Sequence, residues 1–305
     1  GDEIVAPALA FAAVGNAILQ AGFKPVFVDI EKNTLNINPY AIRNVVTNKT
    51  RAIMAVHTMG RPCNMKEIIK VTQEYGLKII EDSCEAHGAK YFGKMVGHWG
   101  DMATFSSYAA HLIFTAEGGM VSTNDEKIAS YLRSIRSHGR PDGSIYFDHV
   151  IPGSNFKMTD LQAGIGIEGT KSFWKIFEKR KENLNYLLNK VQDLNEFAWF
   201  NDPHEGEELS PHAFSVTLKD PSFNFKKLYQ FLEENGVQCK LNFGSMPTQH
   251  KAFSRSFTGL DYKLGDFPEA EYVGNNGLHF GIHQKVIKED LDFVSGLLHE
   301  YFHNI

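Results

Sequence analysis

The stretch Ile79-Ile80-Glu81-Asp82-Ser83-Cys84-Glu85-Ala86-His87-Gly88 joins a short apolar run to two acids and then to small residues. Similar apolar runs occur earlier in the chain, and segments with helical spacing such as 65–75 separate them; the runs cover 4–5, 25–29 and 51–56. This alternation predicts an α/β fold with a mostly parallel sheet flanked by helices. Asp82 then stands at the carboxyl end of a strand, which is the edge where open α/β sheets bind ligands.

The pattern changes in the second half of the chain. Thr159 is expected to cap a helix that ends near Gly169, and a charged helix over 173–191 is expected to bridge two domains. The residues beyond Pro203 indicate a smaller α+β unit, with strands over 212–218 and 237–240, a helix over 225–234, and helices near 269 and 289. We therefore expect a large domain over 1–185 and a small C-terminal domain over 186–305.

The composition limits the classes of partner. The 305 residues carry a formal net charge of -5, and no run of like charge stands out, so a nucleic-acid partner is not expected. Three widely spaced cysteines indicate neither disulfides nor structural zinc, and this usage fits a reducing cytoplasm. No apolar run approaches the roughly 20 residues that span a membrane. The expected partners are small molecules and further copies of the chain.

Five segments together resemble the DegT/DnrJ/EryC1/StrS family of pyridoxal-phosphate sugar aminotransferases and their relatives. They are 1–8, 25–29, 80–88, the pair 105–108 and 117–119, and 153–163, and they follow the family's order and spacing. The resemblance implies a pyridoxal-phosphate-dependent scaffold of fold type I. It also implies pyridoxal or pyridoxamine phosphate as the cofactor, and an obligate homodimer with a shared active site.

The resemblance further implies which residues contact the cofactor. They are Asp82 at the pyridine nitrogen, Cys84 and Phe11 against opposite faces of the ring, Glu85 beside the ring hydroxyl, and Ser106 and Asn155 at the phosphate. Asn155 would reach the phosphate across the dimer interface. Hydroxyl and amide groups can both donate to phosphate oxygens, so the last two assignments are chemically reasonable.

His111 is the main departure from the aminotransferase pattern. It stands five residues after Ser106 and six before Glu117, where the resemblance implies the lysine that binds the coenzyme covalently. A histidine cannot form that bond, but its ordinary pKa of about 6.5 allows it to move protons near neutral pH. The same replacement marks the branch that resembles GDP-4-keto-6-deoxymannose 3-dehydratase and its CDP-sugar counterpart, which use free pyridoxamine phosphate.

This branch implies a 3-dehydratase acting on a nucleotide-linked 4-keto-6-deoxyhexose, with His111 as the base and glutamate as the amino donor. No cysteine follows Cys239, which disfavours the iron–sulfur mechanism of the CDP-sugar counterpart. Two alternatives stay open: a nucleotide-sugar aminotransferase whose lysine was replaced, and a non-catalytic homologue that binds a nucleotide sugar. The resemblance implies a Gly-Thr or Gly-Ser phosphate loop upstream of Gly1. Either part of the large domain is therefore expected to be missing, or the chain is expected to be a degenerate member with a weakened phosphate site.

The remaining candidates have ordinary structural explanations. His57, His87, His98 and His138 lie in turns and are interpreted as hydrogen-bonded loop residues. Metal binding is not expected, because His111, His250 and His283 lack the spacing of metal ligands. Lys240 occupies a place where the resemblance implies an arginine, so a substrate contact and a solvated side chain are both open.

Overall fold

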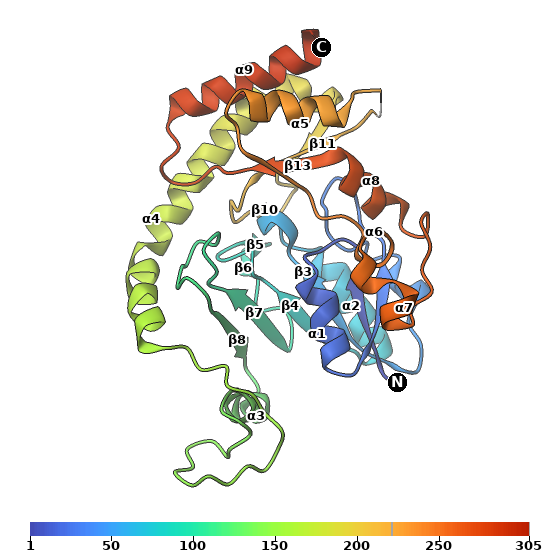
Figure 1. Cartoon of the computed structure of the whole chain (residues 1–305), viewed down its shortest axis with the longest axis vertical. Helices are drawn as coiled ribbons and strands as arrows, with labels where there is room; N and C mark the ends of the chain where they lie inside the picture. The colour runs from blue at the N-terminus through green and yellow to red at the C-terminus, as the bar shows by residue number, and fades with distance from the viewer. Residues whose placement is uncertain (221, 305) are drawn as a thin grey trace.

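The computed structural model describes residues 1–220 and 222–304 and places a six-stranded sheet in the first half of the chain (Figure 1). The strand order is β2-β1-β3-β4-β7-β8, with β1 Glu3–Pro7, β2 Lys24–Val28, β3 Thr50–Val56, β4 Lys78–Asp82, β7 Met102–Ser106 and β8 Gly119–Thr123. All pairings are parallel except that of β7 with β8. The predicted mostly parallel sheet is confirmed.

The order of the strands determines where a ligand can bind. The chain passes from β1 to β2 on one side and then returns to β3 on the other side of β1. A ligand crevice forms at such a switch point, outside the carboxyl ends of the strands. Phe11 follows β1, Asp82 ends β4 and Ser106 ends β7, so three of the predicted site residues lie along this edge.

Helices and short elements surround the sheet. The expected helix over 65–75 is α2 Met65–Tyr75, which the Asn64 side chain caps by accepting from the Glu67 N–H, and which Gly76 ends at a φ of 66°. The other elements before residue 160 are α1 Ala13–Gln20, α3 Glu126–Arg136, β5 Lys90–Tyr91, β6 Lys94–Met95, and 3-10 turns at Ile42–Asn44 and Thr58–Gly60.

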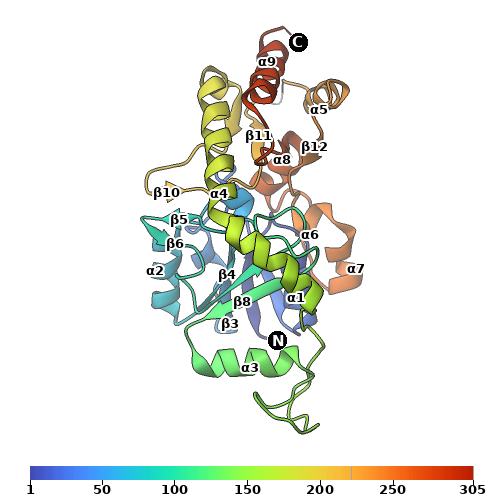
Figure 2. The ribbon, with the colours of Figure 1, turned by 90° about the vertical axis from the view of Figure 1, so that its left-hand side faces the viewer.

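The helix after Thr159 does not end near Gly169. Thr159 and Gln162 form a capping box, as expected, but α4 then runs unbroken over Asp160–Lys190. Two glycines in this part of α4 allow the loop after β7 to pack closely. A Cβ on Gly166 would lie 2.8 Å from Cγ2 of Thr115, and one on Gly169 would lie 3.3 Å from the Phe114 nitrogen. Figure 2 shows α4 crossing in front of the sheet.

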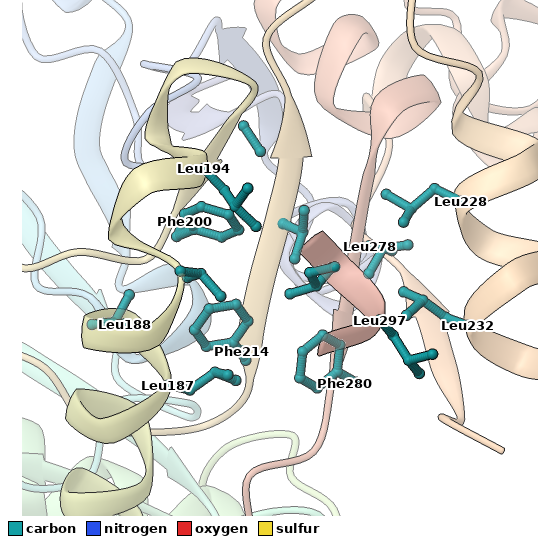
Figure 3. Close-up of a cluster of buried hydrophobic side chains, with 14 of the residues drawn as sticks. Leu187, Leu188, Leu194, Phe200, Phe214, Leu228, Leu232, Leu278, Phe280 and Leu297 are labelled. Atoms are coloured by element: carbon teal, nitrogen blue, oxygen red, sulfur yellow. The ribbon is translucent and has the colours of Figure 1, made fainter. Parts of the chain in front are cut away.

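The second half of α4 enters a separate hydrophobic core. Its Leu187 and Leu188 pack with Phe214, Phe280 and further leucines, as Figure 3 shows. The backbone here is an antiparallel sheet of order β12-β13-β11-β9, with β9 Ala198–Phe200, β11 Phe214–Leu218, β12 Cys239–Leu241 and β13 Gly277–Phe280, covered by α5 Phe225–Glu234 and α9 Lys288–Asn304. The domain boundary near residue 185 stays a prediction, because α4 continues through it.

Part of the C-terminal half packs on the first sheet. Met246, Phe253 and Val273 share one buried cluster with Ile4 and Phe27. The elements in or near this segment are α6 Met246–Gln249, a 3-10 turn at Lys251–Phe253, α7 Arg255–Thr258 and α8 Pro268–Asn276; β10 Glu207–Glu208 and a turn at Gln192–Glu196 precede them. Within the described residues, no helix combines the length and the apolar character needed to cross a membrane.

Candidate active site

Asp82 is the last residue of β4 and lies in register with Val56 on β3 and Thr104 on β7. The backbone N–H of Cys84 donates to Oδ1 of Asp82 over 3.1 Å, so the turn that follows the strand orients the carboxylate. Burial raises the pKa of the Cys84 thiol well above its ordinary value, and nearby Asp82 adds to this effect. Cys84 is therefore a protonated packing residue and not a nucleophile.

Glu81 anchors this strand end from the opposite face. Its carboxylate is fully buried and accepts hydrogen bonds from three backbone N–H groups, those of Gly97, Trp99 and Gly100, at 2.6–2.8 Å. The His57 ring accepts at Nδ1 from the Cys63 N–H, which leaves Nε2 to donate to Glu81 over 3.1 Å. The predicted hydrogen-bonded role of His57 is confirmed, and its partner holds the residue before Asp82 in place.

His111 lies in the loop between β7 and β8. The His111 N–H donates to the Tyr108 carbonyl, and the Tyr108 N–H donates to Oγ of Ser106, which is also the last residue of β7. Gln162 on α4 donates to the Glu117 carbonyl over 2.9 Å, so the far end of the loop is tied to that helix. The sequence spacing of Ser106, His111 and Glu117 thus corresponds to one closed loop at the carboxyl edge of the sheet.

Three histidine rings meet at this loop. The His111 ring centroid lies 5.4 Å from that of His212 and 6.1 Å from that of His87. Burial lowers the pKa of each ring to about 4, so all three are neutral at physiological pH. Nδ1 of His111, Nδ1 of His212 and both ring nitrogens of His87 are buried without a hydrogen-bond partner among the described residues.

His87 therefore differs from its predicted role. The sequence indicated a hydrogen-bonded loop residue, but the ring stacks on Phe105 with centroids 5.5 Å apart and forms no hydrogen bond to a described residue. His212 was expected only as the start of a strand. Since each unpaired buried nitrogen carries a cost in free energy, the cluster is a site where a ligand with polar atoms would be stabilised.

Glu85 faces the same cluster from the turn after β4. The Met59 N–H donates to its Oε2 over 2.6 Å, and its Oε1 lies 3.6 Å from Nε2 of His212, which is too far for a hydrogen bond. Burial raises the pKa of Glu85 to about 7. With His212 neutral at that pH, the two side chains approach each other without forming an ion pair.

Phe11 and the segment around Phe243 form the other side of the crevice. The Phe11 ring is 66% exposed, and it meets the Phe243 ring edge-on at 6.1 Å. An isolated bridge between Leu9 and Ser245, and a hydrogen bond from the Met246 N–H to the Ala8 carbonyl over 2.7 Å, hold this segment against the end of β1. A flat ligand can therefore stack on a rigidly placed aromatic ring.

The structure does not join Asn155 or Lys240 directly to these residues. Asn155 is exposed and pairs with Ser137 just after α3, so within the described residues it has no contact with Ser106. Lys240 lies exposed on β12, but its charge helps to lower the pKa of His212 after burial and Arg180. The expected contact of Asn155 with the phosphate across a dimer interface stays a prediction.

Arg180 is a site residue that sequence reasoning missed. It lies buried on α4 and, with Gln284 and His111, lines an open cleft of about 580 Å³ between that helix and the loop after β7. A signal for it was present in the sequence. Phe173, Phe177, Leu184 and Leu187 follow helical spacing, which places Arg180 on the same buried stripe.

The residues present fit a phosphorylated pyridine cofactor. Phe11 provides an exposed aromatic ring, Asp82 a carboxylate at the end of β4, and Ser106 a hydroxyl at the end of β7. The neutral His111 ring adds a buried nitrogen free to accept a proton. These groups match the stacking, nitrogen-partner and phosphate contacts that such a cofactor requires.

Comparisons with known proteins agree with this geometry. GDP-perosamine synthase of Caulobacter vibrioides is 40% identical over 315 residues, which cover 98% of this chain and 78% of that protein. GDP-4-keto-6-deoxy-D-mannose 3-dehydratase of Escherichia coli O55:H7 is 32% identical over 319 residues, covering 98% and 80%. The solved E. coli enzyme of that name, with bound hydrated PLP, superposes with a TM-score of 0.88 at 31% identity, covering 98% of this chain and 80% of that one.

The profile of the DegT/DnrJ/EryC1/StrS aminotransferase family matches residues 1–299. The expected fold type I and the expected pyridoxal or pyridoxamine phosphate cofactor are thereby confirmed at the level of the family. Its members include enzymes that act on nucleotide sugars by two different reactions. The chain belongs to the DegT/DnrJ/EryC1/StrS aminotransferase family.

Proposed function

We propose that this protein is a pyridoxamine-phosphate-dependent 3-dehydratase of a nucleotide-linked 4-keto-6-deoxyhexose. The observation that carries the proposal is His111: a half-buried, neutral ring with a buried, unpartnered Nδ1 stands where the family resemblance implies a lysine. The relative that removes the 3-hydroxyl of a GDP-linked sugar supports the substrate class. The proposal extends to a cytoplasmic homodimer in which Asn155 of a second copy completes the phosphate site.

In this proposal the chain's own residues position the reactants. Asp82 accepts a hydrogen bond from the pyridine nitrogen, Phe11 stacks on one ring face, Cys84 packs on the other, Glu85 lies beside the ring hydroxyl, and Ser106 donates to the phosphate. Bound pyridoxamine phosphate supplies a primary amine that condenses with the sugar ketone and a ring that accepts electrons. Glu85, with its pKa near 7, can donate or accept a proton at the ring hydroxyl.

His111 moves the proton that the elimination requires. As a neutral ring it accepts a proton, and it then returns a proton to the 3-hydroxyl oxygen of the sugar. The C3–O bond breaks and water leaves. With glutamate restoring the amine, the full turnover converts the hydroxy sugar and glutamate into the 3-deoxy sugar, 2-oxoglutarate and ammonia.

The test is a product assay. Incubation with pyridoxamine phosphate, glutamate and a GDP- or CDP-linked 4-keto-6-deoxyhexose is expected to release ammonia and a 3-deoxy sugar. His111→Asn should lower this rate about 10²- to 10⁴-fold and leave the absorbance of the bound coenzyme unchanged. His98→Asn, which changes an exposed histidine elsewhere, serves as the matched control.

A second candidate function is a nucleotide-sugar aminotransferase. It is favoured by the 40% identity to GDP-perosamine synthase. In that case the same assay yields a stable 4-amino sugar and no ammonia, which would contradict the dehydratase proposal. No coenzyme absorbance at saturating pyridoxamine phosphate would contradict both enzymes and favour a protein that only binds the nucleotide sugar.

A further inference from the structure

Arg180 is a buried cation without a nearby acid. The residue is 8% exposed, and burial alone lowers the pKa of its guanidinium. Its Nε donates to Oε1 of Gln284 over 3.2 Å, and no carboxylate among residues 1–220 and 222–304 forms an ion pair with it. A buried charge that lacks a partner destabilises the fold unless a counter-ion binds beside it.

The segment that carries Gln284 is held in a fixed position. Asn183, one turn beyond Arg180 on α4, donates through Nδ2 to the carbonyls of Ile282, His283 and Val286 over 3.1–3.4 Å. This arrangement places the Gln284 amide beside the guanidinium at the wall of the cleft. The two side chains therefore form a preorganised pair of polar groups and not a chance surface contact.

The cleft also determines what can reach the guanidinium. His111 lines it from the loop side, and Leu112, Phe114 and Ile176 supply apolar walls. Burial and then His212 lower the pKa of His111, and Arg180 is close enough to add to this effect. An anion bound at Arg180 would thus lie next to the proposed base.

We propose that Arg180 and Gln284 bind a carboxylate of the amino donor in the cleft beside His111. One guanidinium and one amide match a single planar carboxylate, which arginine holds through two parallel hydrogen bonds. A diphosphate carries more negative charge than the single Arg180 guanidinium can balance, and the cleft is also lined by Glu168, an acid that pairs with Lys171. The inference rests on the proposed function, because an amino donor is needed there to restore the amine of the coenzyme.

The test measures binding of glutarate, a dicarboxylate that resembles the amino donor and cannot react. Titration calorimetry with the full chain compares the wild type with Arg180→Gln and with Arg43→Gln, which changes a surface arginine paired with Glu74. Arg180→Gln is expected to weaken glutarate binding about 10- to 100-fold, and Arg43→Gln to leave it unchanged. Arg180→Lys should retain part of the affinity, because it keeps the charge but loses the paired geometry.

Two further measurements keep the outcome decisive. A parallel titration with GDP separates the carboxylate from the diphosphate: an Arg180→Gln variant that loses GDP affinity and keeps glutarate affinity overturns the inference. If that variant does not fold, Gln284→Ala replaces it, and unchanged glutarate binding in Gln284→Ala would equally overturn the inference.

NMR titration of His111 should show a higher pKa in Arg180→Gln, and an unchanged pKa would contradict the proximity on which the subsite rests.

The result is independent of the sugar reaction. Glutarate binding requires no turnover, so failure to detect a 3-deoxy product would leave an Arg180-dependent affinity intact. An amino-donor site predicts a specific pattern in Arg180→Gln. Enzyme preloaded with pyridoxamine phosphate should carry out a normal single-turnover elimination, but repeated turnover with glutamate as the amino donor should give no 3-deoxy product.

Discussion

His57 Nε2 lies 3.1 Å from Oε2 of Glu81, and solvent reaches neither side chain. The His57 backbone N–H also donates to the Asp82 carbonyl over 3.0 Å, so this pair joins β3 to β4 at Asp82, the residue proposed to contact the cofactor. Although burial opposes it, hydrogen bonding with His57 and the backbone lowers the pKa of Glu81. The carboxylate is thus ionised at neutral pH and accepts the hydrogen bonds that hold the end of β4 in place.

Glu81→Gln tests this support. The amide presents N–H groups where the carboxylate accepts four hydrogen bonds, so the variant should lose about 3–5 kcal/mol of unfolding free energy. Urea denaturation measures the change. Glu85→Gln is the control, because Glu85 accepts only one backbone hydrogen bond and should lose less than about 1 kcal/mol. Equal losses in both variants would contradict the anchoring role of Glu81.

The neutral His87 ring predicts a pH-dependent stability. Burial, and then His111 and His212, lower its folded pKa to about 4, below the ordinary 6.5. The stabilisation from the neutral ring is therefore present above pH 6.5 and is lost as the pH falls towards 4. His87→Phe keeps the stacking on Phe105 and removes this titration.

Unfolding free energies from urea denaturation at pH 7.5, 6.5, 5.5 and 4.5 measure the difference. Between pH 6.5 and 4, the unfolding free energy of the wild type should fall more steeply with decreasing pH than that of His87→Phe. The two slopes should differ by up to about 1.4 kcal/mol per pH unit. Glu85 titrates in both proteins, with a raised pKa and the opposite sign, so its effect cancels in the comparison. Identical slopes would show that His87 is not buried as a neutral ring.

Gly166 and Gly164 form a matched pair on α4. A Cβ on Gly166 would lie 2.8 Å from Cγ2 of Thr115, whereas nothing lies within 4 Å of one on Gly164. Gly166→Ala should displace the loop that carries His111, costing about 1–3 kcal/mol and lowering the turnover rate. Gly164→Ala should raise the unfolding free energy by about 0.5–1 kcal/mol, because alanine has a higher helix propensity than glycine. Thermal unfolding and steady-state rates of both variants check this, and a stabilised Gly166→Ala would refute the close packing.

Phe11 should contribute to cofactor binding and not to folding. Because its ring is largely exposed, Phe11→Ala is expected to change the unfolding free energy by less than about 0.5 kcal/mol. Loss of stacking should weaken pyridoxamine phosphate binding about 3- to 10-fold in an absorbance titration. Phe257→Ala, which removes another exposed ring, should bind the coenzyme normally.

The sequence predicted the fold where local signals and packing agree. α2 ended at the expected residues because Asn64 and Gly76 cap it in ways visible in the sequence. The break near Gly169 was wrong, because a glycine weakens a helix in isolation but here admits the Phe114 backbone. That contact joins segments more than fifty residues apart, so no local pattern could reveal it.

The site was predictable only in part for the same reason. Asp82 ends an apolar run, so the strand pattern placed it at the sheet edge, whereas Ser106, which ends β7, was placed there only by the family resemblance. His212 comes from the segment just before β11 and Arg180 from α4, and their meeting with His111 depends on the packing of distant elements. The roles of all these residues stay predictions that the variants above can test.

The unbroken α4 has a mechanical consequence. Its 31 residues extend about 46 Å, with Gln162 fastened to the site loop at one end and Leu187 embedded in the second core at the other. Figure 2 shows that α4 changes direction along its length, but the helix is continuous, and a continuous helix resists further bending. We therefore expect the distance between the two sheets to stay constant during turnover. Opening and closing of the cleft would then fall to the short segments around His111 and Gln284.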